Sequence, residues 1–206
     1  MRRRQLILGL AGAGGALAYM LALGAWRKQQ GRAERIEGAA VQTGLPLALS
    51  QMDWRLTSHL GQETAPSDWL GRPALVFFGF TFCPDVCPTT LSNIADWLET
   101  LGSDAMSLTV ALITVDPSRD TAPALAEYLS NFDPRILGLT GSADQIARAA
   151  EGFRVQYAQV PSGGDNYTMN HSAGVFLFHA DGSFANVIDF HEDGRFAVPK
   201  IRRILS

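Results

Sequence analysis

The stretch Ala74-Leu75-Val76-Phe77-Phe78-Gly79-Phe80-Thr81-Phe82-Cys83-Pro84-Asp85-Val86-Cys87-Pro88 decides the fold of this chain. Its apolar first half predicts a buried strand, and the spacing of apolar residues after Pro88 predicts a helix. The only two cysteines of the chain, Cys83 and Cys87, therefore lie at a strand-to-helix turn. Because backbone N–H groups and the helix dipole favour negative charge there, we expect the thiolate form to be favoured over the thiol.

The beginning of the chain differs from the rest. Residues 6–26 carry no charge, and as a helix they would span about 31 Å, enough to cross the hydrocarbon core of a membrane. An apolar stretch of this length favours an uncleaved anchor with a cytoplasmic N-terminus over a cleaved signal peptide, and a twin-arginine export signal is a further alternative. We therefore predict a membrane anchor over 1–26, a tether over 27–50 and a folded domain over 51–206.

The charge of the chain after its basic N-terminal part disfavours one class of function. After residue 35 the chain has 10 Lys and Arg against 19 Asp and Glu, a formal charge of −9. An acidic domain without a basic run is not typical of a nucleic-acid-binding protein, so no nucleic-acid partner is expected.

The order of predicted elements indicates an α/β domain. After an early hairpin we expect strands at 75–80, 108–115, 136–139, 155–160, 174–178 and 184–189. Helices are expected at 89–101, 121–129, 142–152 and 196–205, with N-caps at Thr121 and Ser142 and a loop over 161–170. This order predicts a sheet covered by helices. With a cysteine motif after the first core strand, the layout is similar to that of a thioredoxin-like domain.

The spacing of the two cysteines favours a metal site without excluding a disulfide. Proline disfavours helical geometry at the residue before it, so we expect the helix to begin at Pro88 with Cys87 at its N-cap. The three residues between the cysteines make a wider loop than the two-residue spacer of thioredoxin-type dithiols. A disulfide needs Cβ atoms about 3.5–4.5 Å apart, whereas a metal bound at about 2.3 Å from each sulfur tolerates a wider gap.

A third ligand is expected at His171. This residue comes just before the strand predicted at 174–178, where thioredoxins generally place a cis-proline next to the cysteine turn. We expect His59 to be exposed to solvent. His179, beside a hairpin turn, and His191, after the last strand, are expected to cap backbone groups or to be solvated. Two thiolates and one imidazole suit Cu(I) or Cu(II), and zinc with a bound water remains an alternative.

Several residues around these positions have a structural and a functional interpretation. Asp85 is either an exposed turn residue or a stabiliser of a bound cation, and Asp116 is either a turn cap or a site residue. Arg119 and Asp120 are expected at the surface or in caps, and Met169 in loop packing rather than as a thioether ligand. Four phenylalanines are expected mainly in the core, namely Phe77, Phe78, Phe80 and Phe82. For Phe82 a second role, shielding the metal, is also considered.

Five segments, in order between residues 70 and 190, resemble the signature of the Sco/SenC family. They are Gly79–Leu91 with the cysteine motif, Thr114–Thr121 with Asp-Pro-Ser-Arg-Asp, Phe132–Arg135, Gly138–Gly141 and the segment around His171. One departure lies beside the histidine, where family members often carry Asp and this chain has Asn170. The loss of that charge leaves the tuning of His171 in question, but not its ability to bind a metal.

The resemblance implies a location, a ligand set and a function. Family members are membrane-anchored proteins that face the periplasm or the mitochondrial intermembrane space. They bind Cu(I) or Cu(II) through two cysteines and a histidine, here Cys83, Cys87 and His171. They assist assembly of the binuclear copper site of cytochrome c oxidase subunit II. For this chain the resemblance implies one span in a bacterial inner membrane, a periplasmic soluble domain and a role as a copper metallochaperone, with no catalytic residues.

Three other functions use the same cysteines. Cys83 and Cys87 are a redox-capable pair, so the first alternative is a thiol-disulfide oxidoreductase that reduces the cysteines of subunit II. The second is a sensor whose copper or thiol state reports on the oxidase. A peroxiredoxin-type peroxidase is disfavoured because such enzymes usually have Thr three residues before the reactive cysteine, where this chain has Phe80 and Pro84.

Overall fold

The computed structural model describes residues 44–164 and 166–206. The predicted anchor and most of the predicted tether lie outside these residues. Within the described ranges, no helix combines the length and the apolar character that a membrane span requires.

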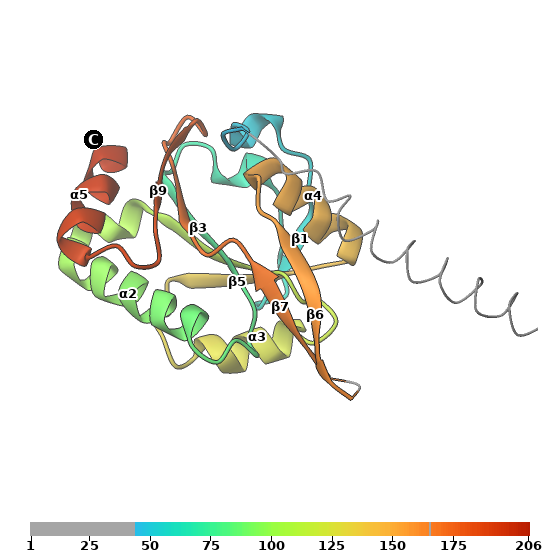
Figure 1. Cartoon of the computed structure of the whole chain (residues 1–206). Helices are drawn as coiled ribbons and strands as arrows, with labels where there is room; N and C mark the ends of the chain where they lie inside the picture. Colours follow the sequence, from blue (N-terminus) through green and yellow to red (C-terminus); the bar gives the residue numbers. More distant parts are fainter. Residues whose placement is uncertain (1–43, 165) are drawn as a thin grey trace, which may run out of the picture. The chain divides into compact units, whose positions relative to one another are not determined.

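A mixed seven-stranded sheet forms the centre of the domain (Figure 1). Its strands are β1 (Leu56–Ser58), β2 (Glu63–Thr64), β3 (Ala74–Gly79), β4 (Thr109–Thr114), β5 (Ile136–Thr140), β8 (Val175–Phe178) and β9 (Phe184–Ile188). Their spatial order is β2-β1-β5-β4-β3-β8-β9, with β3, β4 and β5 parallel and the other pairs antiparallel. Every residue of β3 is buried, as its apolar run predicts for a strand covered on both faces.

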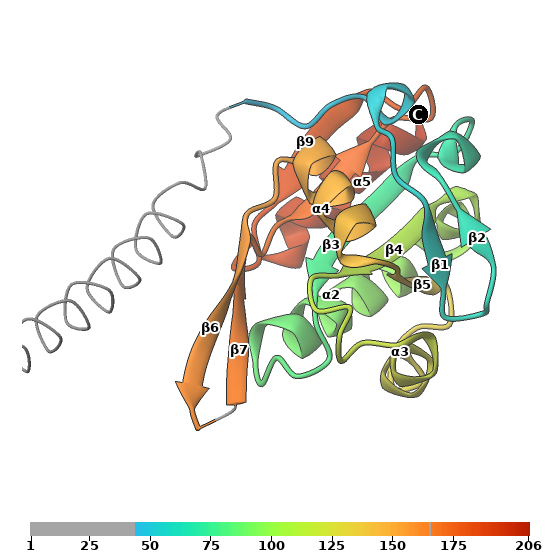
Figure 2. The same cartoon turned by 90° about the vertical axis from the view of Figure 1, so that its right-hand side faces the viewer.

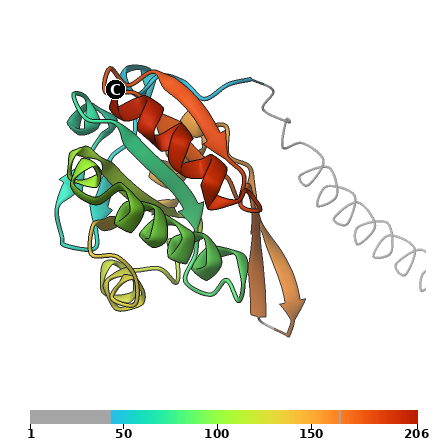
Figure 3. The same ribbon diagram turned by 90° about the vertical axis from the view of Figure 1, so that its left-hand side faces the viewer.

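Helices cover both faces of this sheet, which confirms the predicted α/β architecture. The α-helices are α2 (Val86–Leu101), α3 (Ala122–Leu129), α4 (Ala143–Phe153) and α5 (Gly194–Leu205). Short 3₁₀ turns are η1 (Leu49–Gln51), η2 (Pro66–Trp69) and η3 (Gly102–Ser107). α2 and α5 pack side by side on one face (Figure 3), and α4 lies on the other (Figure 2). The predicted N-caps are confirmed: Thr121 accepts from the Ala124 N–H and Ser142 from the Gln145 N–H.

The loop predicted over 161–170 is wrong, because most of it forms an antiparallel ribbon. β6 (Tyr157–Gly163) pairs with β7 (Asn166–His171) outside the main sheet. The ribbon projects away from the body of the domain (Figure 2). Its strands are only partly buried or exposed, so they lack the apolar alternation by which a half-buried strand is recognised.

Residues just before position 51 already pack against the domain. The Leu47 N–H donates to the Gly152 carbonyl at 2.9 Å, and the Leu49 N–H donates to the Gly182 carbonyl at 2.8 Å. The Leu49 side chain is fully buried. The packed part of the chain therefore includes residues 47–50, which the sequence assigned to the tether.

The carboxyl ends of β3 and β4 lie next to each other and position the site. β3 leads into the cysteine turn, and β4 leads into a loop that begins with Val115. The Val115 N–H donates to the Gly79 carbonyl at 2.9 Å, and this hydrogen bond links the carboxyl ends of β3 and β4. Open α/β sheets bind ligands at this kind of edge.

Candidate metal centre

The two cysteines occupy one turn between β3 and α2. Cys83 is half-buried, Cys87 is 1% exposed, and both are free thiols. The Cys83 N–H donates to the Phe80 carbonyl at 3.2 Å, which closes the turn. The Cys87 N–H then donates to the Cys83 sulfur at 3.4 Å. One sulfur therefore faces the first turn of the helix, where the helix dipole favours negative charge.

The other sulfur is packed into the core. A Cβ atom added at Gly79 would lie 3.1 Å from the Cys87 Sγ and 2.9 Å from the Phe77 Cε1. Glycine at this position of β3 therefore makes room for the buried thiol.

The predicted N-cap position and charge state of Cys87 are wrong. α2 begins at Val86 with Asp85 at its N-cap, so Cys87 lies inside the first turn. Burial raises the pKa of the Cys87 thiol well above its usual range, with the nearby Cys83 sulfur adding to the shift. Without a cation, Cys87 is therefore a neutral thiol, and binding a metal must displace its proton.

His171 ends β7 and points its ring at the cysteine turn. Its Nε2 lies 3.6 Å from the Cys87 Sγ. Its Nδ1 lies 2.9 Å from the Ser172 carbonyl oxygen, which can only accept, so Nδ1 carries the proton and Nε2 presents a lone pair to the sulfur. Burial lowers the pKa of His171, which keeps the imidazole neutral. The ring packs edge-on against Phe77 and Phe80.

This arrangement fits a soft metal ion, with one adjustment. Ligand bonds of about 2.3 Å to sulfur and 2.0–2.1 Å to nitrogen, at tetrahedral to trigonal angles, set the two atoms about 3.5–3.8 Å apart. The 3.6 Å between the Cys87 Sγ and the His171 Nε2 lies within that range. Residues 44–164 and 166–206 hold no group of three or more His, Cys, Asp and Glu side chains already gathered for a metal. The half-buried Cys83 side chain must therefore turn toward the other two to complete a set of three.

The remaining histidines lie in other environments. His59 is half-buried rather than exposed as predicted, and its Nδ1 accepts from the Gly138 N–H at 2.9 Å. The backbone N–H of His179 donates to the Ser183 carbonyl in the turn between β8 and β9. His191 is exposed beside Asp189. Of the four histidines, His171 is the one that the structure brings to the cysteines.

Asn170 does not take the role of a charged neighbour to His171. It is exposed, and alternation along β7 places its side chain on the face opposite to that of His171. The Ser172 carbonyl is the group that orients the imidazole here. Met169 is partly buried against the core, but it packs from strand β7 and not from the predicted loop.

Several predictions for the surrounding residues are wrong. Asp120 is fully buried rather than at the surface, and burial raises the pKa of its carboxyl. Arg119 is half-buried and forms an ion pair with Asp116. Asp116 itself is 3% exposed and accepts from the Ser118 hydroxyl at 2.7 Å, which fits its predicted role as a turn cap. Phe82 is 63% exposed, although Phe77, Phe78 and Phe80 are in the core as predicted. Tyr167, which the sequence placed in a loop, hydrogen-bonds to Asp116. Tyr167, Met169 and His171 alternate with polar residues, but over too few positions to show the apolar period of a strand.

Comparisons with known proteins agree with this fold. Residues 44–206 match the family described as SCO1/SenC, and the chain therefore belongs to this family. The mitochondrial SCO2 homolog of Mus musculus is 37% identical over 212 residues, which span 100% of this chain and 80% of that protein. The domain has the thioredoxin-like Sco fold expected from the sequence.

Two solved structures have a three-dimensional fold similar to that of this domain. Bradyrhizobium japonicum ScoI with copper bound superposes with a TM-score of 0.70 at 35% identity, covering 78% of this chain and 99% of ScoI. BsSco, a member of the Sco family of cytochrome c oxidase assembly proteins, has the same fold with a TM-score of 0.62 at 20% identity, covering 81% of this chain and 98% of BsSco.

Proposed function

We propose that this protein binds copper through Cys83, Cys87 and His171 and delivers it during assembly of cytochrome c oxidase, to the binuclear copper site of subunit II. The observation that carries the proposal is the ligand-distance approach of His171 to Cys87, with Cys83 on the same turn. The Cys87 sulfur lies 3.6 Å from the His171 Nε2, and the Cys83 sulfur lies 3.4 Å from the Cys87 backbone nitrogen. Family membership and the copper bound in ScoI support copper as the cargo over zinc.

The donor set favours copper on chemical grounds as well. Two thiolates and one imidazole suit Cu(I) and Cu(II) alike. The Phe77 and Phe80 rings against His171 keep water from one side of the ligand set. A neutral imidazole needs no deprotonation, so the protons displaced on loading come from the thiols, and burial makes the Cys87 proton hard to remove.

The two sulfurs differ in burial, and this difference determines the side from which an acceptor reaches the copper ion. Cys87 is enclosed by the core, whereas Cys83 is half-buried beside the exposed Phe82. An acceptor thiolate on a partner protein therefore reaches the ion from the Cys83 side. In such an exchange Cys83 is displaced first, while Cys87 and His171 hold the ion until the acceptor has bound it.

Metal analysis of single-residue variants tests the ligand set. The full chain is purified in detergent under anaerobic, reducing conditions, loaded with Cu(I) and desalted. We expect one copper per chain in the parent protein and loss of stoichiometric copper in Cys83→Ala, Cys87→Ala and His171→Ala. His191→Ala is the matched control, because this exposed histidine lies on the loop after β9. Full copper occupancy in His171→Ala contradicts the assignment of the third ligand.

The two free thiols also support a second candidate function, the reduction of cysteines on subunit II. This function needs both cysteines and a half-buried Cys83, but it does not need His171. Complementation of a strain that lacks this protein separates the two. Restored oxidase activity with His171→Ala favours thiol reduction, and loss of activity with that variant favours copper delivery.

We also propose that residues 6–26 anchor the protein in a bacterial inner membrane with the domain in the periplasm. The proposal rests on the 21 uncharged residues of this segment and on the length that they would span as a helix. Protease added to spheroplasts should digest the domain while cytoplasmic proteins stay intact. Protection of the domain in that assay places it on the other side of the membrane.

A further inference from the structure

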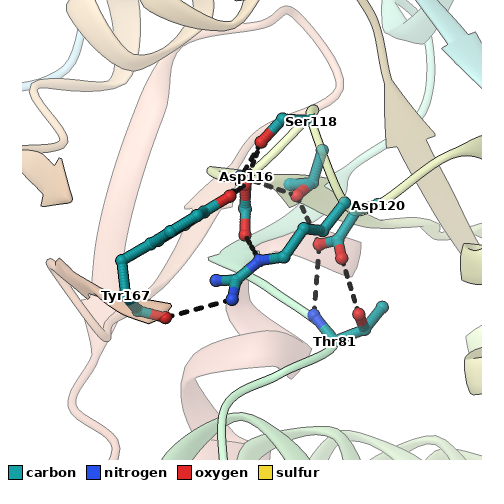
Figure 4. A network of polar contacts seen from close by, with 7 residues as sticks. Thr81, Asp116, Ser118, Asp120 and Tyr167 are labelled. Atoms are coloured by element: carbon teal, nitrogen blue, oxygen red, sulfur yellow. Dashed lines mark hydrogen bonds and ion pairs between the residues drawn. The ribbon is translucent and has the colours of Figure 1, made fainter. Parts of the chain in front are cut away.

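The loop of residues 116–120, which follows β4, contacts the two segments of the chain that carry the proposed ligands. On one side it reaches the cysteine turn, and on the other it reaches β7, which ends at His171. Figure 4 shows how its side chains lie between Thr81 and Tyr167. The copper-binding role proposed above uses none of these contacts directly.

Asp120 fixes the start of the cysteine turn. Its carboxylate is fully buried and accepts from the Thr81 backbone N–H at 3.1 Å, the Thr81 hydroxyl at 2.6 Å and the Thr114 hydroxyl at 2.6 Å (Figure 4). These bonds join the turn to the end of β4. The loop therefore has a rigid attachment on the cysteine side.

Arg119 lies between an aromatic ring of the cysteine turn and one of the ribbon. Its guanidinium carbon is 4.6 Å from the ring centroid of Phe82, the residue before Cys83, and 3.8 Å from the ring centroid of Tyr167. Its Nε pairs with the buried carboxylate of Asp116. A planar guanidinium can stack on rings and donate from its edge at the same time, which an ammonium group cannot do.

Tyr167 fixes the ribbon to the same loop through three further groups. Its hydroxyl donates to the Asp116 carboxylate at 2.9 Å and lies 2.9 Å from the Ser118 hydroxyl. Its carbonyl accepts from the Arg119 Nη1 at 3.0 Å. Alternation along β7 puts Tyr167 and His171 on the same face, four residues apart. A contact that holds Tyr167 in place therefore also fixes the distance of His171 from the cysteine turn.

The ribbon needs such an attachment. Among the residues that the structure describes, β6 and β7 pair only with each other, and an isolated two-stranded hairpin is marginally stable in water. We propose that Arg119 and Tyr167 are positioning residues, which hold the ribbon against the 116–120 loop so that the His171 Nε2 stays within ligand distance of Cys87. This inference rests on the proposed copper-binding function.

Substitutions at the two positions should weaken copper binding in a graded way. Loss of groups that orient metal ligands typically lowers metal affinity by roughly 10- to 100-fold, and we expect a loss of that size for Arg119→Gln. Arg119→Lys keeps the charge beside Asp116 but loses the stacked plane, so a smaller loss is expected. Tyr167→Phe keeps the ring over Arg119 and loses only the hydroxyl bonds, so its loss should also be smaller.

The test measures Cu(I) affinity and the ligands of bound Cu(I) in the full chain in detergent. Affinity comes from anaerobic competition with a chromophoric Cu(I) chelator. X-ray absorption of the loaded protein reports imidazole scattering, which should fall in Arg119→Gln toward the level of His171→Ala. Arg195→Gln is the matched control, because Arg195 pairs with Asp193 and stacks on Phe196 at the start of α5. We expect parental affinity and scattering in that variant.

A double variant separates positioning from a general effect on the fold. If Arg119 acts through His171, adding Arg119→Gln to His171→Ala should cause little further loss of Cu(I) affinity. An equal fold loss in both backgrounds, or parental imidazole scattering in Arg119→Gln, overturns the inference. Failure of the proposed function is read separately, from parental Cu(I) binding by His171→Ala alone.

Discussion

Replacing Gly79 by alanine should disturb the fold and the copper site together. The added Cβ would lie 2.9 Å from the Phe77 Cε1, 3.1 Å from the Cys87 Sγ and 3.1 Å from the Leu112 Cδ1. Ordinary contacts begin near 3.4 Å, so each neighbour must move by a few tenths of an ångström. All three neighbours are about 1% exposed, and none of them can move into solvent.

The size of the effect follows from this overpacking. Extra methyl groups in a well-packed core typically cost about 1–3 kcal/mol. For a domain of this size, each kcal/mol lowers the melting temperature by roughly 2–4 °C, so we expect a fall of roughly 2–12 °C. Because one of the displaced atoms is the Cys87 sulfur, the Cu(I) affinity should fall as well.

Thermal unfolding and anaerobic Cu(I) competition measure the two effects. Gly138→Ala is the matched control: its Cβ would lie 2.6 Å from the Leu129 Cδ1, and its other near neighbours are Leu125 and His59. That variant should be destabilised like Gly79→Ala while keeping the parental Cu(I) affinity. A parental melting temperature and a parental Cu(I) affinity in Gly79→Ala would refute the argument that glycine makes room for the thiol.

Three further predictions concern the thiols and one ion pair. In the reduced, copper-free protein, iodoacetamide should label Cys83 at least about tenfold faster than Cys87, as read by peptide mass spectrometry, because Cys87 is buried and its pKa is raised. For the same reason the apparent Cu(I) affinity should rise with pH between 6 and 8, by about tenfold per pH unit for each proton displaced; a flat profile argues against a protonated Cys87. Hydrogen bonds from Arg135 lower the pKa of Asp133, so the pair stabilises the fold above about pH 4 and this contribution is lost as pH falls through the lowered pKa. Asp133→Asn should therefore lower the melting temperature at pH 7, and a difference from the parent that does not shrink at pH 3 contradicts this assignment.

The elements that the sequence predicted well are those whose signals are local. The apolar run of β3 predicts a strand buried on both faces, because no polar residue interrupts it. Thr121 and Ser142 are predictable caps because each bonds to a backbone N–H three residues later. The approach of His171 to Cys87 follows from the order of strands in a thioredoxin-like sheet, and its Nε2 lies 3.6 Å from the Cys87 sulfur.

The features that the sequence did not reveal depend on contacts between distant segments. Burial of Cys87 arises from its packing beneath β3, so the shift of its pKa cannot be read from the turn alone. Asp120 looks like a surface residue until Thr81 and Thr114 are brought to it. The strand predicted over 155–160 covers part of β6, but β7 was missed because the ribbon is held by polar and aromatic contacts such as that of Tyr167 with Arg119, which leave no apolar period in the sequence.

The projecting ribbon also bears on how copies of this protein behave when crowded together. A long, flat strand edge is a template on which another chain can add a strand and start an aggregate. Here β6 carries Pro161, which has no N–H to donate, and the pairing register shifts between Pro161 and Gly163. The ribbon can therefore project into solvent at high local concentration, because its edge is a poor template on which a neighbouring molecule could add a strand.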